Sequence, residues 1–592
     1  MSPSSPYDLD AHNTAVSGIS ASVSRFARSK TPFKVYHGST NSTRITSFAR
    51  DRIVDTSALN HVLSITRTST TSTSAGTSSP TAKPKYPYTA FLEPNVPFDA
   101  LVRATLAHDP PLVPPVVPEF PGITAGGAFA GVAGESSSFV HGFFDQTVER
   151  VEVVLPDEEG RVLRDVRPDG EGGEEGRKLF WGVAGSFGSV AVVTGLEVGL
   201  VRAGRREMGR GLKYEGRGDV GQKEREVQFL DGMLFARDRG AIVSARMVDA
   251  ESPDAKGLKT VRFDRARDEW FYIYIDKLSK RAASSSRPSL PAANGSEQQQ
   301  PIATFLTPLP SYLFRFDRGA FWTASYAFPL FHTPFTRLTR CLLDPLMRTR
   351  RLYRAWNASG FAQSYFVQDV AVPFESVAEL VDWVESELPG GSIGGKWWRE
   401  EKGRGVGHGQ SKKGGVWPIW LCPLRVEGTG GVPLGARVGA KGRREVNETF
   451  AAADRSAGGK PQNVWGEDRS AAEKPSHLLN LGIWGPGPPS HDTFIETNRS
   501  LEQLLHTRLG GFKWLYANAY YTEEEFWDVY NKEAYEEVRK KTEAHGWVPS
   551  VFEKTRAKEE RVERGRLRGV LAAVGGEGKG YLLKAKMAGK QK

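Results

Sequence analysis

A glycine-rich segment, residues 121–142 (PGITAGGAFAGVAGESSSFVHG), constrains this chain more than any other feature. Six of its 22 residues are glycine, and many of the others are alanine or serine. Such a segment lets backbone N–H groups approach an anion closely and adopt the positive φ angles that a cradle requires. The pattern is neither G-x-G-x-x-G after a strand nor G-x-x-x-x-G-K-[ST], so a Rossmann site and a P-loop are not indicated. A tight-packing glycine turn is the structural alternative.

Two further segments have a similar character. Residues 37–44 (HGSTNSTR) follow a strand-like stretch at 33–36, an order in which phosphate cradles are commonly built. Residues 179–193 (LFWGVAGSFGSVAVV) join an aromatic pair to glycines and then to a β-rich run. A strand-end bulge is the alternative for this segment. Together with the glycine-rich segment, these residues predict a site for an anion such as a pyrophosphate.

The length of 592 residues favours two or more domains. After about residue 206, glycine-rich and β-rich segments give way to longer amphipathic stretches and aromatic clusters, and we place a domain boundary there. The predicted order is an amphipathic or flexible segment (1–30), a first domain (31–206), a second domain (207–553) and a charged, at best solvated, tail (554–592). Flexible insertions are predicted at 67–83, 165–177, 280–301, 390–415 and 426–476.

Charge and cysteine content exclude several classes of protein. The net charge is +10, but basic and acidic residues alternate instead of gathering on one element, so we expect no nucleic-acid partner. An anionic nucleotide or an anionic lipid is compatible with this charge. The two cysteines, Cys341 and Cys422, support neither a disulfide framework nor a zinc site, and no other metal-ligand cluster is present. No signal-peptide core and no run of about 18 apolar residues occurs.

The three segments carry a resemblance when they are taken in order. The T-x-G-G at residues 124–127, the GESSS at 134–138 and the GSFG at 185–188 resemble the PCMH-type FAD domain of the vanillyl-alcohol-oxidase superfamily. The chain is more closely similar to the Δ24-sterol reductase family, over most of its length outside the insertions. That similarity rests on residues 134–144 (GESSSFVHGFF), 312–322 (YLFRFDRGAFW), 366–373 (FVQDVAVP), 417–424 (WPIWLCPL) and 511–527 (GFKWLYANAYYTEEEFW).

The resemblance implies an α+β protein in which a two-part PCMH-type FAD-binding domain precedes an α+β substrate or cap domain. It implies noncovalent FAD, NADPH as the hydride donor, and reduction of the side-chain C24=C25 double bond of a sterol. His37 and His141 are the candidates for covalent flavin attachment, which we do not expect. The expected cofactor-binding residues are His37, Gly38, Ser39, Thr40, Thr124, Ala125, Gly126, Gly127, Gly131, Gly134, Glu135, Ser136, Ser137, Ser138, His141, Gly185, Ser186 and Gly188.

The chain departs from the family in two ways. The N-terminal membrane anchor that is common in the animal and plant enzymes has no counterpart, and neither do the insertions. We therefore expect a cytoplasmic protein or one peripherally associated with the endoplasmic reticulum membrane, with residues 15–29 and the tail as candidates for membrane contact. The sterol and the oligomeric state stay open.

An isolated alkene has no carbonyl to polarise it, so a proton must lead or accompany the hydride. The reaction needs a positioned acid, a dry pocket and aromatic faces that stabilise positive charge. The predicted acids are Tyr516, Tyr520, Asp369 and Glu135, although Glu135 also suits the capping of a turn. The predicted substrate-binding residues are Tyr312, Phe314, Arg315, Arg318, Phe321 and Trp322. The two arginines suit NADPH phosphates or the flavin, or equally a surface ion pair with Asp317.

Two other functions stay open. An FAD-dependent oxidase of a sugar, alcohol or lactone has the same first domain but passes electrons to oxygen, and it predicts a polar pocket with a His or Glu base. A non-catalytic lipid-binding relative predicts no flavin.

Overall fold

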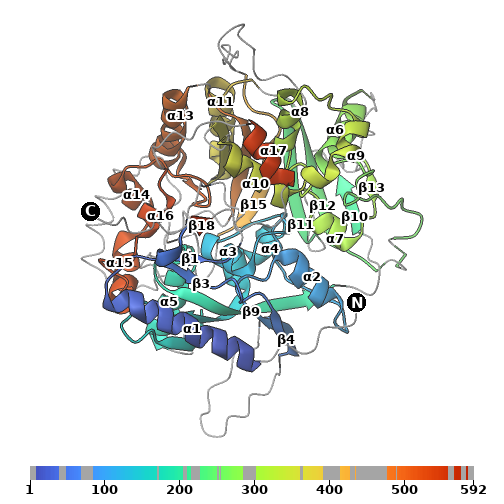
Figure 1. The fold of residues 1–592 in the computed structure, drawn as a ribbon. Helices are drawn as coiled ribbons and strands as arrows, with labels where there is room; N and C mark the ends of the chain where they lie inside the picture. Colours follow the sequence, from blue (N-terminus) through green and yellow to red (C-terminus); the bar gives the residue numbers. More distant parts are fainter. Residues whose placement is uncertain are drawn as a thin grey trace, which may run out of the picture.

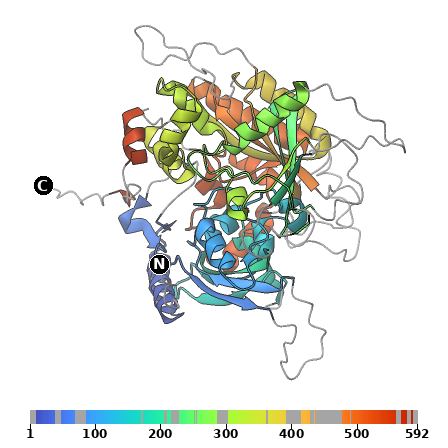
Figure 2. The same cartoon turned by 90° about the vertical axis from the view of Figure 1, so that its right-hand side faces the viewer.

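The structure is a computed structural model of the chain and has two main sheets, one in each half of the molecule (Figures 1 and 2). It describes residues 9–38, 44, 48–68, 85–169, 173–203, 210–214, 227–249, 252–253, 255–284, 302–360, 364–390, 414–426, 434, 477–488, 490–557, 566–574 and 582–583. Helices pack on both sheets, and the predicted α+β class is confirmed. Among the helices described, none is long and apolar enough to cross a membrane.

The first sheet has the order β4-β5-β9-β7-β8, with β6 paired to β9. Every pairing in it is antiparallel, and the long β9 lies at its centre because it pairs with both β5 and β7. Its strands are β4 (Val62–Arg67), β5 (Tyr88–Leu92), β6 (Leu112–Val113), β7 (Val148–Val154), β8 (Val162–Val166) and β9 (Val192–Arg202). Its helices are α1 (Leu9–Arg28), α2 (Phe98–Leu106), α3 (Ala125–Gly131), α4 (Ser138–His141) and α5 (Gly173–Val183). The two-stranded pairs are β1 (Lys34–Tyr36) with β3 (Ile53–Asp55), and β2 (Phe48–Ala49) with β18 (Leu582–Leu583).

The second sheet is eight-stranded, with the order β13-β10-β12-β11-β15-β16-β14-β17. Its strands are β10 (Arg210–Tyr214), β11 (Phe229–Ala236), β12 (Arg239–Met247), β13 (Thr304–Phe305), β14 (Tyr365–Val372), β15 (Ile419–Arg425), β16 (His477–Pro486) and β17 (Phe512–Lys513). Its helices are α6 (Phe271–Ser284), α7 (Leu309–Leu313), α8 (Ala327–Leu330), α9 (Arg337–Leu342), α10 (Thr349–Ser359), α11 (Val377–Glu387), α13 (His491–Leu504), α14 (Glu523–Val529), α15 (Lys532–Lys541), α16 (Val551–Thr555) and α17 (Arg566–Val574). Strands β14 and β16 are almost entirely buried, as expected for central strands covered on both faces, whereas half-buried residues alternate with buried ones along most of β15. The predicted boundary near residue 206 lies between the strands of the two sheets, just outside the described residues.

The end of the chain returns to the first half of the molecule. The Tyr535 hydroxyl lies 2.6 Å from the Ser189 hydroxyl, and the Arg539 guanidinium donates to the Ser189 carbonyl. The Val538 side chain packs so closely over Gly182 that a Cβ at Gly182 would lie 2.8 Å from it. In Figure 1 the orange helices α14 to α16 accordingly flank both layers.

The structure corrects three expectations about flexible segments. Residues 173–177 are not a loop but the first turns of α5, where Glu174 and Glu175 suit the positive end of the helix dipole. Residues 280–284 are the last turn of α6. The tail is not solvated throughout, because α17 packs along α10 and the partly buried Lys554 donates to the Gly188 carbonyl. The rest of the predicted insertions lies outside the described residues, apart from a few residues at their ends and Leu434.

The first 30 residues contain the predicted amphipathic helix, which is α1 in the structure. A buried charge on α1 holds it against the first sheet. His12 is fully buried and lies between two carboxylates, with Nδ1 2.8 Å from Glu93 and Nε2 3.1 Å from Glu152. Burial alone would lower the pKa of His12, but hydrogen bonds to Glu152 and Glu93 raise it to about 9. An imidazolium therefore holds α1 against the first sheet.

We expect the protein to lose stability between pH 6.5 and pH 9. Because the folded pKa of His12 is raised to about 9, its contribution is complete below its ordinary pKa of 6.5 and is lost as pH rises through 9. His12→Gln should cost about 3 kcal/mol at pH 6.5, since it removes the buried cation between two carboxylates and leaves Glu152 with only the half-exposed Arg164. Urea unfolding of both proteins from pH 6 to 10 measures this. A wild-type advantage that does not shrink with rising pH would contradict it.

Candidate active site

A cavity of about 1570 Å³ lies between the two halves and is lined by residues of both. Small-molecule sites usually have volumes of ~300–1,000 Å³. This cavity therefore has room for more than one ligand. Its lining divides into a glycine edge, a cationic end, an aromatic cluster and a buried acid pair.

The glycine edge is formed by α3 and the turn before it. Thr124 caps the helix, and its hydroxyl accepts a hydrogen bond from the Gly127 N–H at 3.1 Å. A Cβ at Gly126 would lie 2.6 Å from the Pro94 side chain and 2.9 Å from its carbonyl oxygen, so only glycine allows this approach. Gly127, Gly131 and Gly134 follow along the same edge. The segment is therefore both the predicted tight-packing turn and part of the cavity wall.

The cationic end gathers basic residues from distant parts of the chain. Lys34, Arg44, Lys554 and Arg556 line it. Arg44 stacks 4.7 Å over the Phe187 ring and donates to the Lys554 carbonyl at 2.8 Å. The Lys554 ammonium donates to the carbonyls of Gly188 at 2.7 Å and Phe187 at 3.2 Å, and among the described residues it has no carboxylate partner.

Burial and the neighbouring Arg539 and Arg44 lower the pKa of Lys554 to about 7. The positive charges at this end thus oppose one another, and an anionic ligand would relieve them. Nearby, His37 is half-buried, its Nδ1 is buried and unpartnered, and burial lowers its pKa. The GSFG turn brings its carbonyls to Lys554 by placing Gly185, Phe187 and Gly188 at positive φ, which favours glycine at two of the three positions.

An aromatic cluster forms the apolar part of the lining. The Phe120 ring contacts the rings of Phe321, Tyr353 and Trp484, with centroid distances of 5.3, 6.1 and 5.9 Å. Phe321 also contacts Trp420 and Trp484, and Trp484 is held by the neighbouring Trp322, whose indole donates to its carbonyl at 2.7 Å. The surface is flat, apolar and electron-rich, which suits a large hydrophobic ligand or a developing cation.

The acid pair is Asp369 and Tyr516. The Tyr516 hydroxyl donates to Asp369 Oδ2 at 2.5 Å, and both residues line the cavity. Burial raises the pKa of Asp369 to about 6, against the lowering effect of the Tyr516 hydrogen bond. Burial and Asp369 together keep the pKa of Tyr516 well above its usual value. Asp369 can therefore hold and release a proton near neutral pH.

Gly482 makes room for this carboxylate. Asp369 on β14 pairs with Gly482 on β16, which in turn pairs with Trp420 on β15. A Cβ at Gly482 would lie 2.9 Å from Asp369 Oδ1 and 3.1 Å from Trp420 Cβ. Because Gly482 has no side chain, the carboxyl group of Asp369 can lie along the sheet beside the aromatic cluster.

The structure brings part of the predicted site together. The predicted residues that line the cavity are His37, Thr124, Gly126, Gly127, Gly131, Gly134, Gly188, Phe321, Asp369, Tyr516 and Tyr520. Those that lie outside its lining are Gly38, Ala125, Glu135, Ser136, Ser137, Ser138, His141, Gly185, Ser186, Tyr312, Phe314, Arg315, Arg318 and Trp322. Ser39 and Thr40 lie outside the described residues.

Glu135 caps a turn, which was the structural alternative to its predicted role as an acid. Its carboxylate accepts hydrogen bonds from the Ser136 hydroxyl, the Ser137 hydroxyl and the Ser137 N–H, so it caps its own turn. His141 is also away from the cavity, where burial and the nearby Lys85 and Arg425 lower its pKa to about 4. Neither residue is in place to contact a ligand in the cavity.

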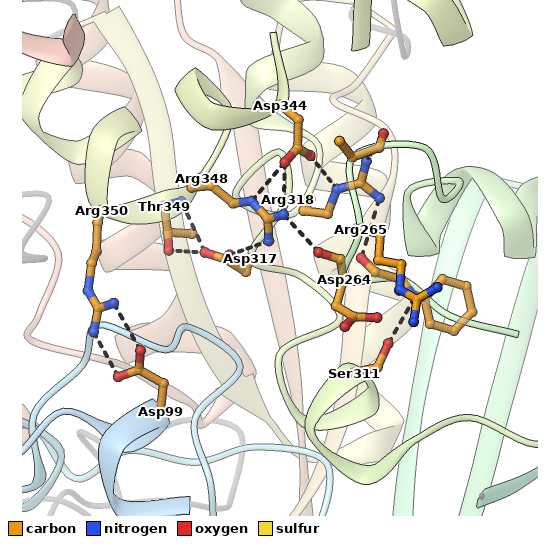
Figure 3. A network of polar contacts seen from close by, with 12 residues as sticks. Asp99, Asp264, Arg265, Ser311, Asp317, Arg318, Asp344, Arg348, Thr349 and Arg350 are labelled. Carbon is orange, nitrogen blue, oxygen red and sulfur yellow. Dashed lines mark hydrogen bonds and ion pairs between the residues drawn. The ribbon is translucent and has the colours of Figure 1, made fainter. Parts of the chain in front are cut away.

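Arg315 and Arg318 are buried, so the predicted alternative, a surface ion pair with Asp317, is wrong. Arg315 donates to Asp231 at 2.7 Å. Arg318 donates to Asp344 at 2.6 Å and to backbone carbonyls, whereas Asp317 accepts from Arg348 and Thr349 (Figure 3). Each guanidinium already has a carboxylate partner, which leaves neither arginine free for a phosphate.

Several lining residues were not predicted from the sequence, among them Glu119, Tyr353, Asn480, Trp484, Lys554 and Arg556. Asn480 and Trp484 lie in the strand-like 478–484 segment, where alternation with buried neighbours could have indicated a lining face. Lys554 gave no signal, because a lysine at the start of a charged tail resembles any solvated lysine.

No family model matches the chain. It is 24% identical to human Delta(24)-sterol reductase over 448 residues, which cover 74% of this chain and 69% of the human protein. It is also 24% identical to the Arabidopsis thaliana Delta(24)-sterol reductase over 493 residues, covering 79% and 73% of the two chains, and 20% identical over 464 residues to the Caenorhabditis elegans homolog of the same enzyme, covering 74% and 70%.

The fold and site define an α+β protein in which two antiparallel sheets enclose one large cavity with a cationic end and a buried acid. The similarity in sequence spans most of this architecture. The chain is therefore similar to the Δ24-sterol reductases over about three quarters of its length, which confirms the resemblance carried by the motifs.

Lys554→Met should weaken the binding of an anionic nucleotide at the cationic end. Using ADP as the probe in calorimetric titration, we expect about tenfold weaker binding at pH 6.5, because a buried charge partner is removed. Binding to the wild type should weaken as pH rises through 7, where the Lys554 ammonium loses its proton. Lys541→Met, at a half-exposed lysine paired with Glu175, is the control. Equal affinities in all three proteins would contradict the assignment.

Proposed function

We propose that the protein is an FAD-dependent reductase of the side-chain double bond of a sterol, with NADPH as the hydride donor. One observation carries the proposal: a cavity large enough for two ligands joins an anion-binding end to a buried acid beside an aromatic cluster. The relatives named Delta(24)-sterol reductase support the choice of substrate class.

The residues present fit FAD. Its pyrophosphate matches Lys554, which has no carboxylate partner among the described residues, and the neighbouring Arg44, and the glycine edge around Gly126 lets a flat ligand approach the backbone. The unpartnered Nδ1 of His37 is available for a hydrogen bond to the same cofactor. When bound, FAD would supply hydride transfer between NADPH and the sterol carbon. We infer noncovalent binding: of the two candidates for covalent attachment, His141 lies away from the cavity, and a hydrogen bond is the simpler role for His37.

Asp369 supplies the proton in this proposal. In its neutral form it protonates the less substituted alkene carbon, and Tyr516, by donating to Oδ2, stabilises the carboxylate that remains. Positive charge then develops on the tertiary carbon, where the faces of Phe321, Trp420 and Trp484 stabilise it. The aromatic cluster also excludes water, which would otherwise capture the cation.

The absorbance of the purified protein tests the reaction class. Under anaerobic conditions we expect NADPH to bleach a bound flavin band, and a Δ24-unsaturated sterol such as desmosterol to restore it. A band that recovers only with oxygen would indicate an oxidase, for which Glu119, His37 and His491 are polar lining residues. No flavin band at all would indicate a lipid-binding relative.

Asp369→Asn should lower the rate of flavin reoxidation by sterol about 10²-fold or more, because general acids typically contribute ~10²–10⁴-fold. The wild-type rate should fall as pH rises through about 6, since the proton must be on Asp369, and the variant should lose this dependence. Asp145→Asn is the control, because Asp145 is also buried with a pKa raised by burial to about 7 but lies outside the cavity lining. Equal losses in both variants would point to a structural effect.

A further inference from the structure

Glu119 is a buried acid in the cavity lining that the proposed chemistry does not use. Its side chain is 7% exposed, its Oε1 has no hydrogen-bond partner, and no side chain among the described residues forms an ion pair with it. A buried carboxyl oxygen without a hydrogen-bond partner is destabilising, and in a cavity wall a bound ligand can supply that partner.

The surroundings of Glu119 show which kind of ligand group would fit. Its charged neighbours are Glu135, Arg315 and Asp231, of which Arg315 is already paired with Asp231 and Glu135 is occupied by its own turn. Burial and the nearby Glu135 raise the pKa of Glu119 well above its usual value. A neutral carboxyl group both donates and accepts a hydrogen bond, which matches an alcohol and not a cation.

Position relates Glu119 to the rest of the site. It precedes Phe120, a member of the aromatic cluster, and its electrostatic neighbours Asp231 and Cys422 lie on β11 and β15. Asp369 lies on β14, beyond β16, in the order β11-β15-β16-β14. Glu119 therefore lies near β11 and β15, whereas Asp369 lies on β14 of the same sheet. The aromatic rings of Phe321, Trp420 and Trp484 are nearby. A long flat molecule could contact both at once.

We propose that Glu119 anchors the hydroxyl group of the substrate, so that the site selects hydrophobic alcohols over hydrocarbons and esters of the same shape. The inference rests on the proposed function and deepens it. Glu119 fixes one end of the ligand, which places the far end at Asp369. It is a specificity residue and takes no part in proton transfer.

The test uses the full-length protein and two ligands that cannot react, a sterol with a saturated side chain and the same molecule without its hydroxyl group. Binding is followed by quenching of tryptophan fluorescence, since Trp420, Trp484 and Trp514 line the cavity. We expect the wild type to bind the alcohol about tenfold or more tightly than the hydrocarbon, as one buried hydrogen bond allows. Glu119→Leu should abolish this preference and Glu119→Gln should keep most of it. Glu523→Gln, at another acid of the lining, is the control and should leave it unchanged.

Thermal unfolding without ligand gives a second readout. Glu119→Leu should not lower the unfolding temperature and should raise it slightly, because it removes an unpartnered buried acid. Two results with Glu119→Leu would overturn the inference: a lowered unfolding temperature, or loss of bound flavin in place of loss of alcohol preference. Equal affinities of the wild type for alcohol and hydrocarbon would also overturn it. Each of these results would leave a sterol site in place. Failure of the wild type to bind either ligand would overturn the proposed function as well.

Discussion

The return of residues 532–557 to the first half of the molecule is the constraint on which the cavity depends. Tyr535 and Arg539 bind the Ser189 turn, and Lys554 binds the carbonyls of Phe187 and Gly188. These contacts hold the GSFG turn against the last helices. Arg350 and Asp99 add a second link, between α10 and α2, through two hydrogen bonds of 2.8 and 3.0 Å. The two sheets therefore share walls of one cavity, although each sheet is formed from a separate part of the chain.

Charge compensation separates structural residues from ligand-binding ones in this protein. Arg315, Arg318 and Lys513 are more deeply buried than the partly buried Lys554, but each donates to a carboxylate, on Asp231, Asp344 and Glu502. Lys554 and Glu119 lack such partners among the described residues, and both line the cavity. A buried charge or acid without a partner in a cavity wall indicates a ligand more strongly than residue type does, because a bound group can offset the free-energy cost of burying it.

Local sequence pattern predicted much of the fold and part of the site. The helix at 15–29, the strands at 88–92 and 478–484, and the glycine edge follow from periodicity and composition, because their packing is decided within a few residues. The two arginines of the RFDRGAFW segment were misread, since their partners Asp231 and Asp344 are distant in sequence. Lys554 and Glu119 could not be found either, because segments distant in sequence form the cavity that both residues line. Asp369 and Tyr516 were among the candidates, but only the strand register that places Gly482 beside Asp369 shows why its carboxyl group fits.

The late position of Lys554 in the chain has a consequence for biosynthesis. Both sheets are complete in sequence by Lys513, yet the cationic end of the cavity still lacks Lys554 and Arg556 at that point. A growing chain can therefore form its hydrophobic cores before it can hold an anionic ligand tightly. On the proposed function, ligand loading would come after the last helices have docked, and a chain shortened before α16 would lose Lys554 and Arg556 from this end of the cavity.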